Sequence, residues 1–129
     1  MASESLPLFQ SYCYGPADLL TLRKGDSTMW LSLRDPAGKL AEAVYHGCVY
    51  WQLEQPRIHL SLVQRLSTEE LMLHSDSPAL LELRNNTSDV EGLLREWEAD
   101  GLCLFLHLGN RPDAEFLVAA RSLEYRETP

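Results

Sequence analysis

The 129-residue sequence lacks long apolar runs, since its clearly apolar stretches extend for only a few residues. A helix needs about 18 consecutive apolar residues to cross a bilayer, so we expect no membrane span and no membrane partner. The first residues, MASESLPLFQ, also lack the basic region and the apolar stretch that form a secretory signal.

Cysteine is scarce, and linker sequence is absent. The three cysteines, Cys13, Cys48 and Cys103, are odd in number and lie far apart. A disulfide framework needs pairs, so we expect reduced thiols and a cytoplasmic location. No Pro-, Gly- or Ser-rich tract divides the chain, and its length suits one core. Residues 1–129 are therefore expected to form a single domain.

Basic residues are also in the minority. The chain has 11 Lys and Arg against 19 Asp and Glu, a net charge of −8, and no basic run offsets the excess locally. Such a chain repels phosphate backbones, so we expect no nucleic-acid partner. The acidity favours solubility, or attraction to a basic protein.

Several catalytic motifs are missing from the sequence. The patterns GxSxG, GxGxxG, HExxH and CxxC do not occur, and neither does a P-loop. Acyl transfer by a nucleophile elbow and phosphate binding in a glycine loop therefore lack support. No pair of carboxylates is set in apolar surroundings, which a raised general-acid pKa would require. We predict no catalytic residues and no cofactor.

What the sequence does have is a regular alternation of apolar and polar residues from Asp18 to Leu66. The segments DLLTLRK and TMWLSLR flank a turn at Gly25-Asp26, which predicts a hairpin. A two-residue loop there would place Leu22 opposite Met29 and Leu20 opposite Leu31. A five-residue loop, DPAGK, leads into a third strand. Its predicted pairs are Arg34 with Leu40, Leu31 with Ala43 and Met29 with Tyr45.

The third strand is expected to run from Leu40 to Glu54 and to turn at Gln55-Pro56 into a fourth. Pairing outward from that turn predicts Leu53 with Ile58, Trp51 with Leu60, Val49 with Leu62 and Tyr45 with Leu66. All three loops then give one common apolar face, which predicts a four-stranded antiparallel meander. The opposite face would be polar.

The second half predicts helices and a final hairpin. Ser67 with Glu70 forms a capping box, which predicts a short helix through about His74, and SPALLELRN is interpreted as extended. A second box, Ser88 with Glu91, predicts a helix with one apolar stripe that ends at Asp100-Gly101. LCLFLHL predicts a central strand, and EFLVAARSLEY predicts the last strand. The fold class is α+β, with the N-terminal meander, one or two helices packed on one of its faces and a C-terminal hairpin.

The segment VYHGCVYWQL gathers reactive residue types around Gly47. Strand alternation explains this gathering, because it would turn His46, Cys48 and Tyr50 outward together. Side chains two apart on a strand are separated by roughly 6.5 Å, too far for a Cys–His proton transfer. A metal site made from His46, Cys48 and His59, with His107 or Cys103, lacks suitable spacing. We therefore predict neither a dyad nor a metal site.

The polar face of the meander is the predicted interaction face. If helices cover only the other face, an open patch remains, formed by Trp30, His46, Tyr50, His59 and Arg65. The leading hypothesis is a non-enzymatic protein-binding module, which acts either as an inhibitor or immunity-like protein or as a homodimer.

Two other hypotheses stay open. One is a small-ligand-binding protein or enzyme, with a pocket between the sheet and the helix that contains Trp97, lined by Tyr45, Trp51 and Phe105. The other is a structural subunit that assembles through an edge strand.

Overall fold

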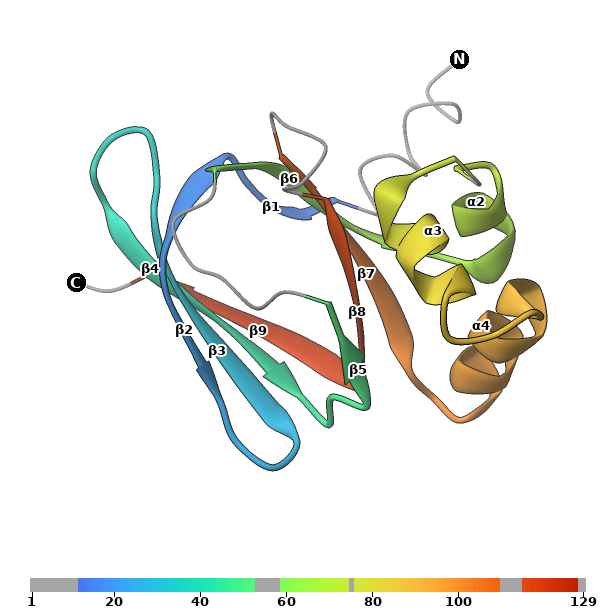
Figure 1. Cartoon of the computed structure of the whole chain (residues 1–129). Helices are drawn as coiled ribbons and strands as arrows, with labels where there is room; N and C mark the ends of the chain where they lie inside the picture. The colour runs from blue at the N-terminus through green and yellow to red at the C-terminus, as the bar shows by residue number, and fades with distance from the viewer. Residues whose placement is uncertain (1–11, 53–58, 75, 110–114, 128–129) are drawn as a thin grey trace, which may run out of the picture.

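The computed structural model describes residues 12–52, 59–74, 76–109 and 115–127. In these ranges nine strands form one antiparallel sheet, in the order β5-β8-β7-β6-β2-β3-β4-β9, with β1 paired to β6 (Figure 1). The strands are β1 (Tyr12–Tyr14), β2 (Ala17–Lys24), β3 (Thr28–Arg34), β4 (Leu40–His46), β5 (Tyr50–Trp51), β6 (His59–Leu66), β7 (Cys103–Gly109), β8 (Phe116–Ala120) and β9 (Ser122–Glu127). The helices are α2 (Thr68–Met72), α3 (Pro78–Arg84) and α4 (Val90–Ala99). The predicted α+β class is confirmed.

The sheet closes on itself through two bends. Only Arg121 separates β8 from β9, yet β8 pairs with β7 while β9 pairs with β4. A second bend at Gly47 separates β4 from β5, which pairs with β8. The ladder continues through both bends, because the Arg121 N–H donates to the His46 carbonyl at 2.9 Å. The strands therefore surround a common interior (Figure 1).

The meander β2-β3-β4 is present, with one register correction. Leu31 pairs with Leu22 and Met29 pairs with Lys24, so the predicted Leu22–Met29 and Leu20–Leu31 pairs are wrong by two residues. The turn is longer than expected, and it is closed by a hydrogen bond from the Gly25 N–H to the Thr28 carbonyl. Side chains alternate with a period of two, so an error of two residues keeps Leu22, Met29 and Leu31 on their predicted face.

The second predicted register is confirmed, since Leu31 pairs with Ala43, Met29 with Tyr45 and Arg34 with Leu40. One further irregularity affects β2. A bulge between Leu19 and Thr21 buries Leu19 completely and leaves Leu20 half-buried, outside the core.

The fourth predicted strand forms, but it has different neighbours. β4 ends at His46 and pairs with β9, so the predicted Tyr45–Leu66 and Trp51–Leu60 pairs are wrong. β6 pairs with β2, β7 and β1 instead. The bend at Gly47, where φ is +66°, carries the chain away from the line of β4. The four strands are adjacent in the order β6-β2-β3-β4, and the predicted turn at 55–56 lies outside the described residues.

The helices follow their capping residues. The Ser67 capping box of α2 is confirmed, and α4 ends at Asp100 as predicted. The N-cap of α4 is Asp89, one residue later than predicted. The extended interpretation of SPALLELRN is wrong, because this segment forms α3 with Ser77 as N-cap and Pro78 in its first turn.

Two cores share one wall of the sheet. The predicted central strand β7 is confirmed: Phe105 points into the first core, inside the closed sheet, and Leu104 and Leu106 point into the second. The second core lies between the outer face of β6-β7-β8 and the three helices (Figure 1). The helices therefore do not cover the apolar face of the meander, which the sheet buries against its own opposite wall.

Candidate functional site

The structure separates Tyr50 from the rest of the predicted interaction face. Its ring stacks on Trp97 of α4, with 5.2 Å between the ring centroids, and it packs against the second core. Its hydroxyl accepts a hydrogen bond from Gln52 Nε2 at 2.9 Å. Tyr50 is therefore covered by the helices and does not lie on an open sheet face.

Trp30 and His46 do lie on the outer face of β2-β3-β4-β9, which the helices leave uncovered. Trp30 is half-buried, and the guanidinium carbon of Arg23 lies 4.8 Å from the centre of its ring. His46 is exposed, and its Nε2 lies 3.2 Å from a carboxylate oxygen of Glu124. This part of the meander has the polar outer surface that alternation predicts.

His59 and Arg65 lie elsewhere. His59 pairs with Asp18, and its Nδ1 lies 2.8 Å from that carboxylate, whereas Trp30 pairs with Arg23. Asp18 and Arg23 are five residues apart on β2, which amounts to about 16 Å. Arg65 is six residues from His59 along β6, or about 20 Å. The five predicted residues therefore do not form one patch, and their role in binding stays a prediction.

Cys48 corrects the expected orientation of the segment around Gly47. It is buried in the first core, and its Sγ donates to the Tyr45 carbonyl at 3.4 Å, while His46 points to solvent. The bend at Gly47 puts the two side chains on different sides of the sheet. Burial raises the pKa of Cys48 to about 11, which disfavours a thiolate. The described residues contain no group of three metal-binding side chains close enough to hold an ion.

The second core fills the space between the sheet and the helix of Trp97, where the alternative small-ligand hypothesis placed a pocket. Tyr45 and Phe105 belong to the first core, with ring centroids 5.4 Å apart, on the other side of the wall formed by β7 and β8. Trp97 packs against the second core. Trp97 and Phe105, which are close in the sequence, are thus separated by a layer of strands.

Sequence reasoning missed a buried hydrogen-bond chain in the first core. The Tyr14 and Tyr45 hydroxyls are 2.5 Å apart, and the Tyr45 hydroxyl is 2.5 Å from Nε2 of His107. His107 is fully buried, and its Nδ1 has no hydrogen-bond partner among the described residues. Burial lowers the pKa of His107 to about 3 and raises those of both phenols. The three residues stay neutral, and this arrangement favours a structural role.

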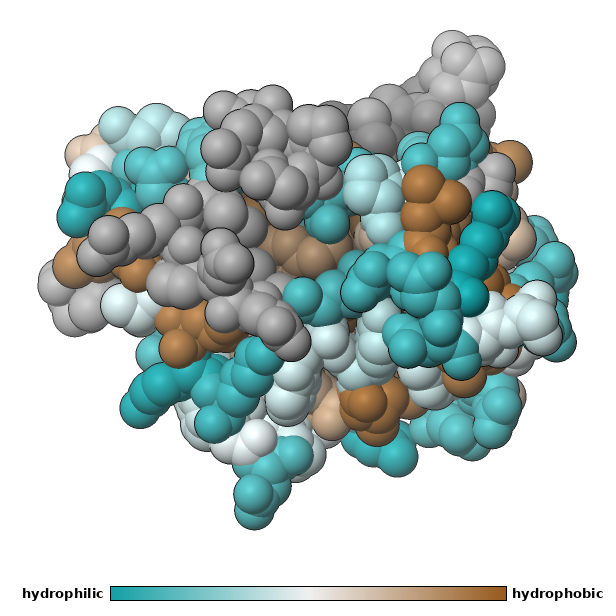
Figure 2. Space-filling view, viewed as in Figure 1, coloured by the Kyte–Doolittle hydropathy of each residue, from teal (hydrophilic) through white to brown (hydrophobic). Residues whose placement is uncertain are grey.

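The helices carry most of the net charge. Residues 67–100, which we name the acidic helical layer, contain nine of the 19 acidic residues and two of the 11 basic residues. Nine less two gives −7 of the total −8. Its surface also exposes two leucines, Leu73 at 83% and Leu81 at 47%. Hydrophilic residues dominate this side, with hydrophobic atoms exposed among them (Figure 2).

A groove follows the seam where β9 lies beside β1, with no ladder between these two strands among the described pairings. This seam groove encloses about 410 Å³. One side is lined by Cys13, Arg65, Cys103 and Phe105, and the other by Arg121, Leu123 and Tyr125. It is the candidate site for a small molecule.

The comparisons with known proteins give no relative. No family model matches the chain, and neither a curated protein nor a solved structure matches it significantly. In the part of the chain that the structure describes, no helix is long and apolar enough to span a membrane.

Proposed function

We propose that the chain is a non-enzymatic protein-binding module, and that its acidic helical layer binds a basic protein. The single observation that carries the proposal is the charge distribution, because residues 67–100 hold −7 of the net charge while the rest of the chain is nearly neutral. A concentrated negative field attracts a positively charged partner and speeds its association. Binding of this kind suits an inhibitor or an immunity-like protein.

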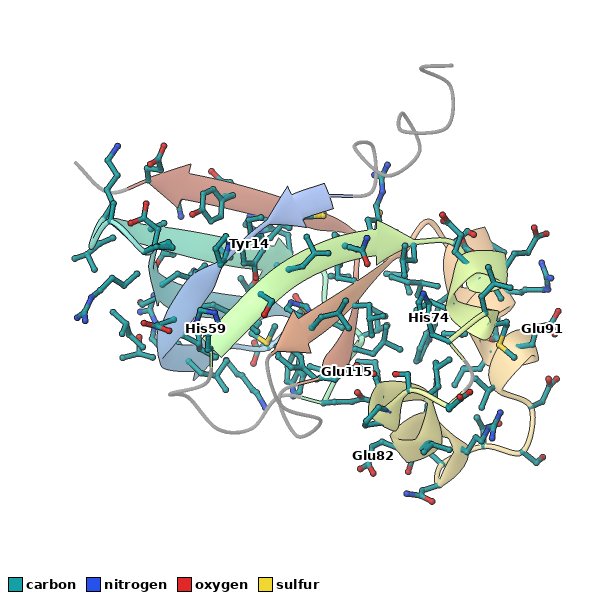
Figure 3. The ribbon with its side chains drawn as sticks, turned by 90° about the horizontal axis from the view of Figure 1, so that it is seen from above. Tyr14, His59, His74, Glu82, Glu91 and Glu115 are labelled. Carbon is teal, nitrogen blue, oxygen red and sulfur yellow. The ribbon has the colours of Figure 1, made fainter. Side chains whose placement is uncertain are left out.

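Not all of this charge is neutralised within the layer. Asp89 caps α4, and Glu98 accepts hydrogen bonds from the backbone and hydroxyl of Thr68. Arg95 pairs with Glu91 at 2.8 Å, and that hydrogen bond is the largest cause of its raised pKa. Other carboxylates project outward, as Glu82 does in Figure 3. The layer therefore presents an excess of negative charge to a partner.

Leu73 and Leu81 add the apolar contacts that such a surface needs. A single exposed leucine is ordinary. Here two leucines are exposed on α3 and at the end of α2, within the region of highest negative charge. Apolar anchors surrounded by charge are common in protein interfaces, where the charges guide association and the anchors slow dissociation.

The experiment starts with capture of partners from the native host by the immobilised full chain, followed by affinity measurements with each purified partner. We expect Glu96→Lys and Leu73→Ala each to weaken binding on the order of tenfold, and added salt to weaken it further. Lysine at position 96 lies near the end of α4, where a positive charge suits the helix dipole, so the fold should be kept. Asp26→Lys, in the β2–β3 turn, is the control with the same charge change, and we expect it to bind as tightly as the wild type.

The proposal would be wrong if every captured protein bound Glu96→Lys and Leu73→Ala as tightly as the wild type. Failure to capture any protein, together with a dimer in light scattering, would favour self-association instead. If Trp30→Ala weakened binding while the two helical variants did not, the interface would be the outer face of the sheet around Trp30 and His46.

A further inference from the structure

We infer that the seam groove is a binding site for a small organic carboxylate with a flat apolar body, held by Arg65. This site is separate from the acidic helical layer. Among the residues that line the groove, Arg65 and Arg121 are basic, Phe105 and Leu123 are apolar, and Tyr125 is an aromatic residue that is 40% exposed. Ligand sites commonly combine a mainly apolar lining with a few polar groups that fix orientation.

The placement of Arg65 is the main observation. Arg65 pairs directly with Phe105, whose side chain is buried in the first core. Residues paired across strands put their side chains on the same face, so Arg65 lies on the core-facing side of β6. Its side chain is nevertheless exposed, because the sheet is open along this seam. Alternation alone predicted Arg65 on the polar outer face, and the register overturns that prediction.

Arg65 has no acidic partner among the residues that the structure describes. Although acidic residues outnumber basic ones, neither Arg65 nor Arg121 forms an ion pair with a described carboxylate. Burial raises the pKa of the neighbouring Cys13 thiol even though the charge of Arg65 opposes the shift, so Cys13 stays neutral. With two arginines and no carboxylate among its described lining residues, the groove favours an anionic ligand.

Arg121 is held in position before any ligand binds. Its side chain packs on Gly47, where a Cβ atom would lie 2.8 Å from its Cγ, and its Nη1 donates to the Asp100 carbonyl at 3.1 Å. A guanidinium has five N–H donors, so one such bond leaves several for other acceptors. Arg121 can therefore add positive charge to the end of the groove without losing further side-chain entropy.

The apolar lining selects the body of the ligand. Tyr125 stacks on Tyr14 with 5.1 Å between ring centroids and 23° between the planes. Tyr125 also lines the groove, next to Leu123 and across from Phe105. A flat ring can lie against this lining while its carboxylate reaches Arg65, since guanidinium groups bind carboxylates through two parallel hydrogen bonds. The groove volume of about 410 Å³ lies in the ordinary range for small ligands.

The test uses phenylacetate as the probe and amide chemical shifts of the full chain as the readout. A ligand of this size should bind with a Kd of about 1 mM. We expect shifts at Cys13, Cys103 and Tyr125. The neutral analogue phenylacetamide should bind about tenfold more weakly, because it cannot form the charged pair. Acetate, which lacks the ring, should also bind about tenfold more weakly.

Arg65→Gln should lower the affinity for phenylacetate about tenfold. The amide spectrum of this variant should still be that of a folded protein. The matched control is Arg34→Gln, an exposed arginine at the other end of the sheet, and it should leave the affinity unchanged. Equal binding of phenylacetate and phenylacetamide would overturn the inference, and so would equal binding by the Arg65 and Arg34 variants. The result is independent of the basic partner, since both variants keep the acidic helical layer intact.

Discussion

At the scale of the residue, His107 is a titratable side chain that is fully buried. It is stacked on Phe116 with 4.0 Å between ring centroids, and within the described part of the chain its Nε2 alone has a hydrogen-bond partner, the Tyr45 hydroxyl. The cost of charging a buried imidazole without a carboxylate lowers its pKa to about 3. A buried neutral histidine links the stability of the protein to pH.

His107 should make the protein less stable in weak acid. The unfolded chain binds a proton near pH 6.5, whereas the folded protein does so only near its pKa of about 3. Below pH 6.5 the unfolded state therefore holds more protons, and lowering the pH from 7 to 5 should remove about 2 kcal/mol of unfolding free energy. Urea unfolding at both pH values should show this loss in the wild type and in Tyr14→Phe. In His107→Phe the loss should be about 2 kcal/mol smaller, and an equal loss would contradict the account.

At the scale of the element, bends and caps decide where each strand or helix ends. Gly47 has a φ of +66° and ends β4, although the sequence alternates smoothly through it. Ser77 and Pro78 start α3 in a segment interpreted as extended, and the signal was present, since proline is favoured in the first turn after a serine cap. Leu80 and Leu83, three residues apart and both buried, confirm the helical spacing.

Gly47→Ala should cost more stability than Gly38→Ala. Both glycines have a positive φ, so alanine costs about 1 kcal/mol at either position. A Cβ at Gly38 would have no neighbour within 4 Å, whereas at Gly47 it would lie 2.8 Å from Cγ of Arg121. We expect a loss of about 2 to 3 kcal/mol for Gly47→Ala in urea unfolding. If Arg121→Ala is added to Gly47→Ala, part of the stability that Gly47→Ala loses beyond Gly38→Ala should be recovered. If the stability losses of the two substitutions simply add, the contact with Arg121 does not cause that extra loss.

At the scale of the whole molecule, the wall β6-β7-β8 joins the two cores. On β7, Phe105 belongs to the first core and Leu104 to the second, and on β8 Val118 and Leu117 divide in the same way. Each core therefore needs the other to keep its strands in place. We expect the helices and the closed sheet to unfold together.

Leu94→Ala and Leu31→Ala test this coupling from opposite sides of the wall. Leu94 is fully buried in the second core and Leu31 in the first, so each truncation should cost about 2 to 5 kcal/mol. Within each variant, the helical circular dichroism signal and the near-ultraviolet signal should be lost at the same urea concentration. A separate, earlier loss of helix in Leu94→Ala would show that the layers unfold independently.

The sequence by itself determined the features that depend on a few neighbouring residues. These are the capping box at Ser67, the end of α4 at Asp100, the register of β3 with β4 and the central position of β7. Each follows from local hydrogen bonds, loop length or alternation, which depend only on residues that are close together in the sequence.

Only the tertiary structure decided which strand takes the free edge of β4, which side of the sheet the helices cover and where Arg65 points. Several apolar strands could have filled that edge, and the choice depends on bends at Gly47 and Arg121 that alternation does not record. Five residues predicted to share one face were dispersed for the same reason. A closed sheet sets the neighbours of a side chain through long-range packing, which no local pattern specifies.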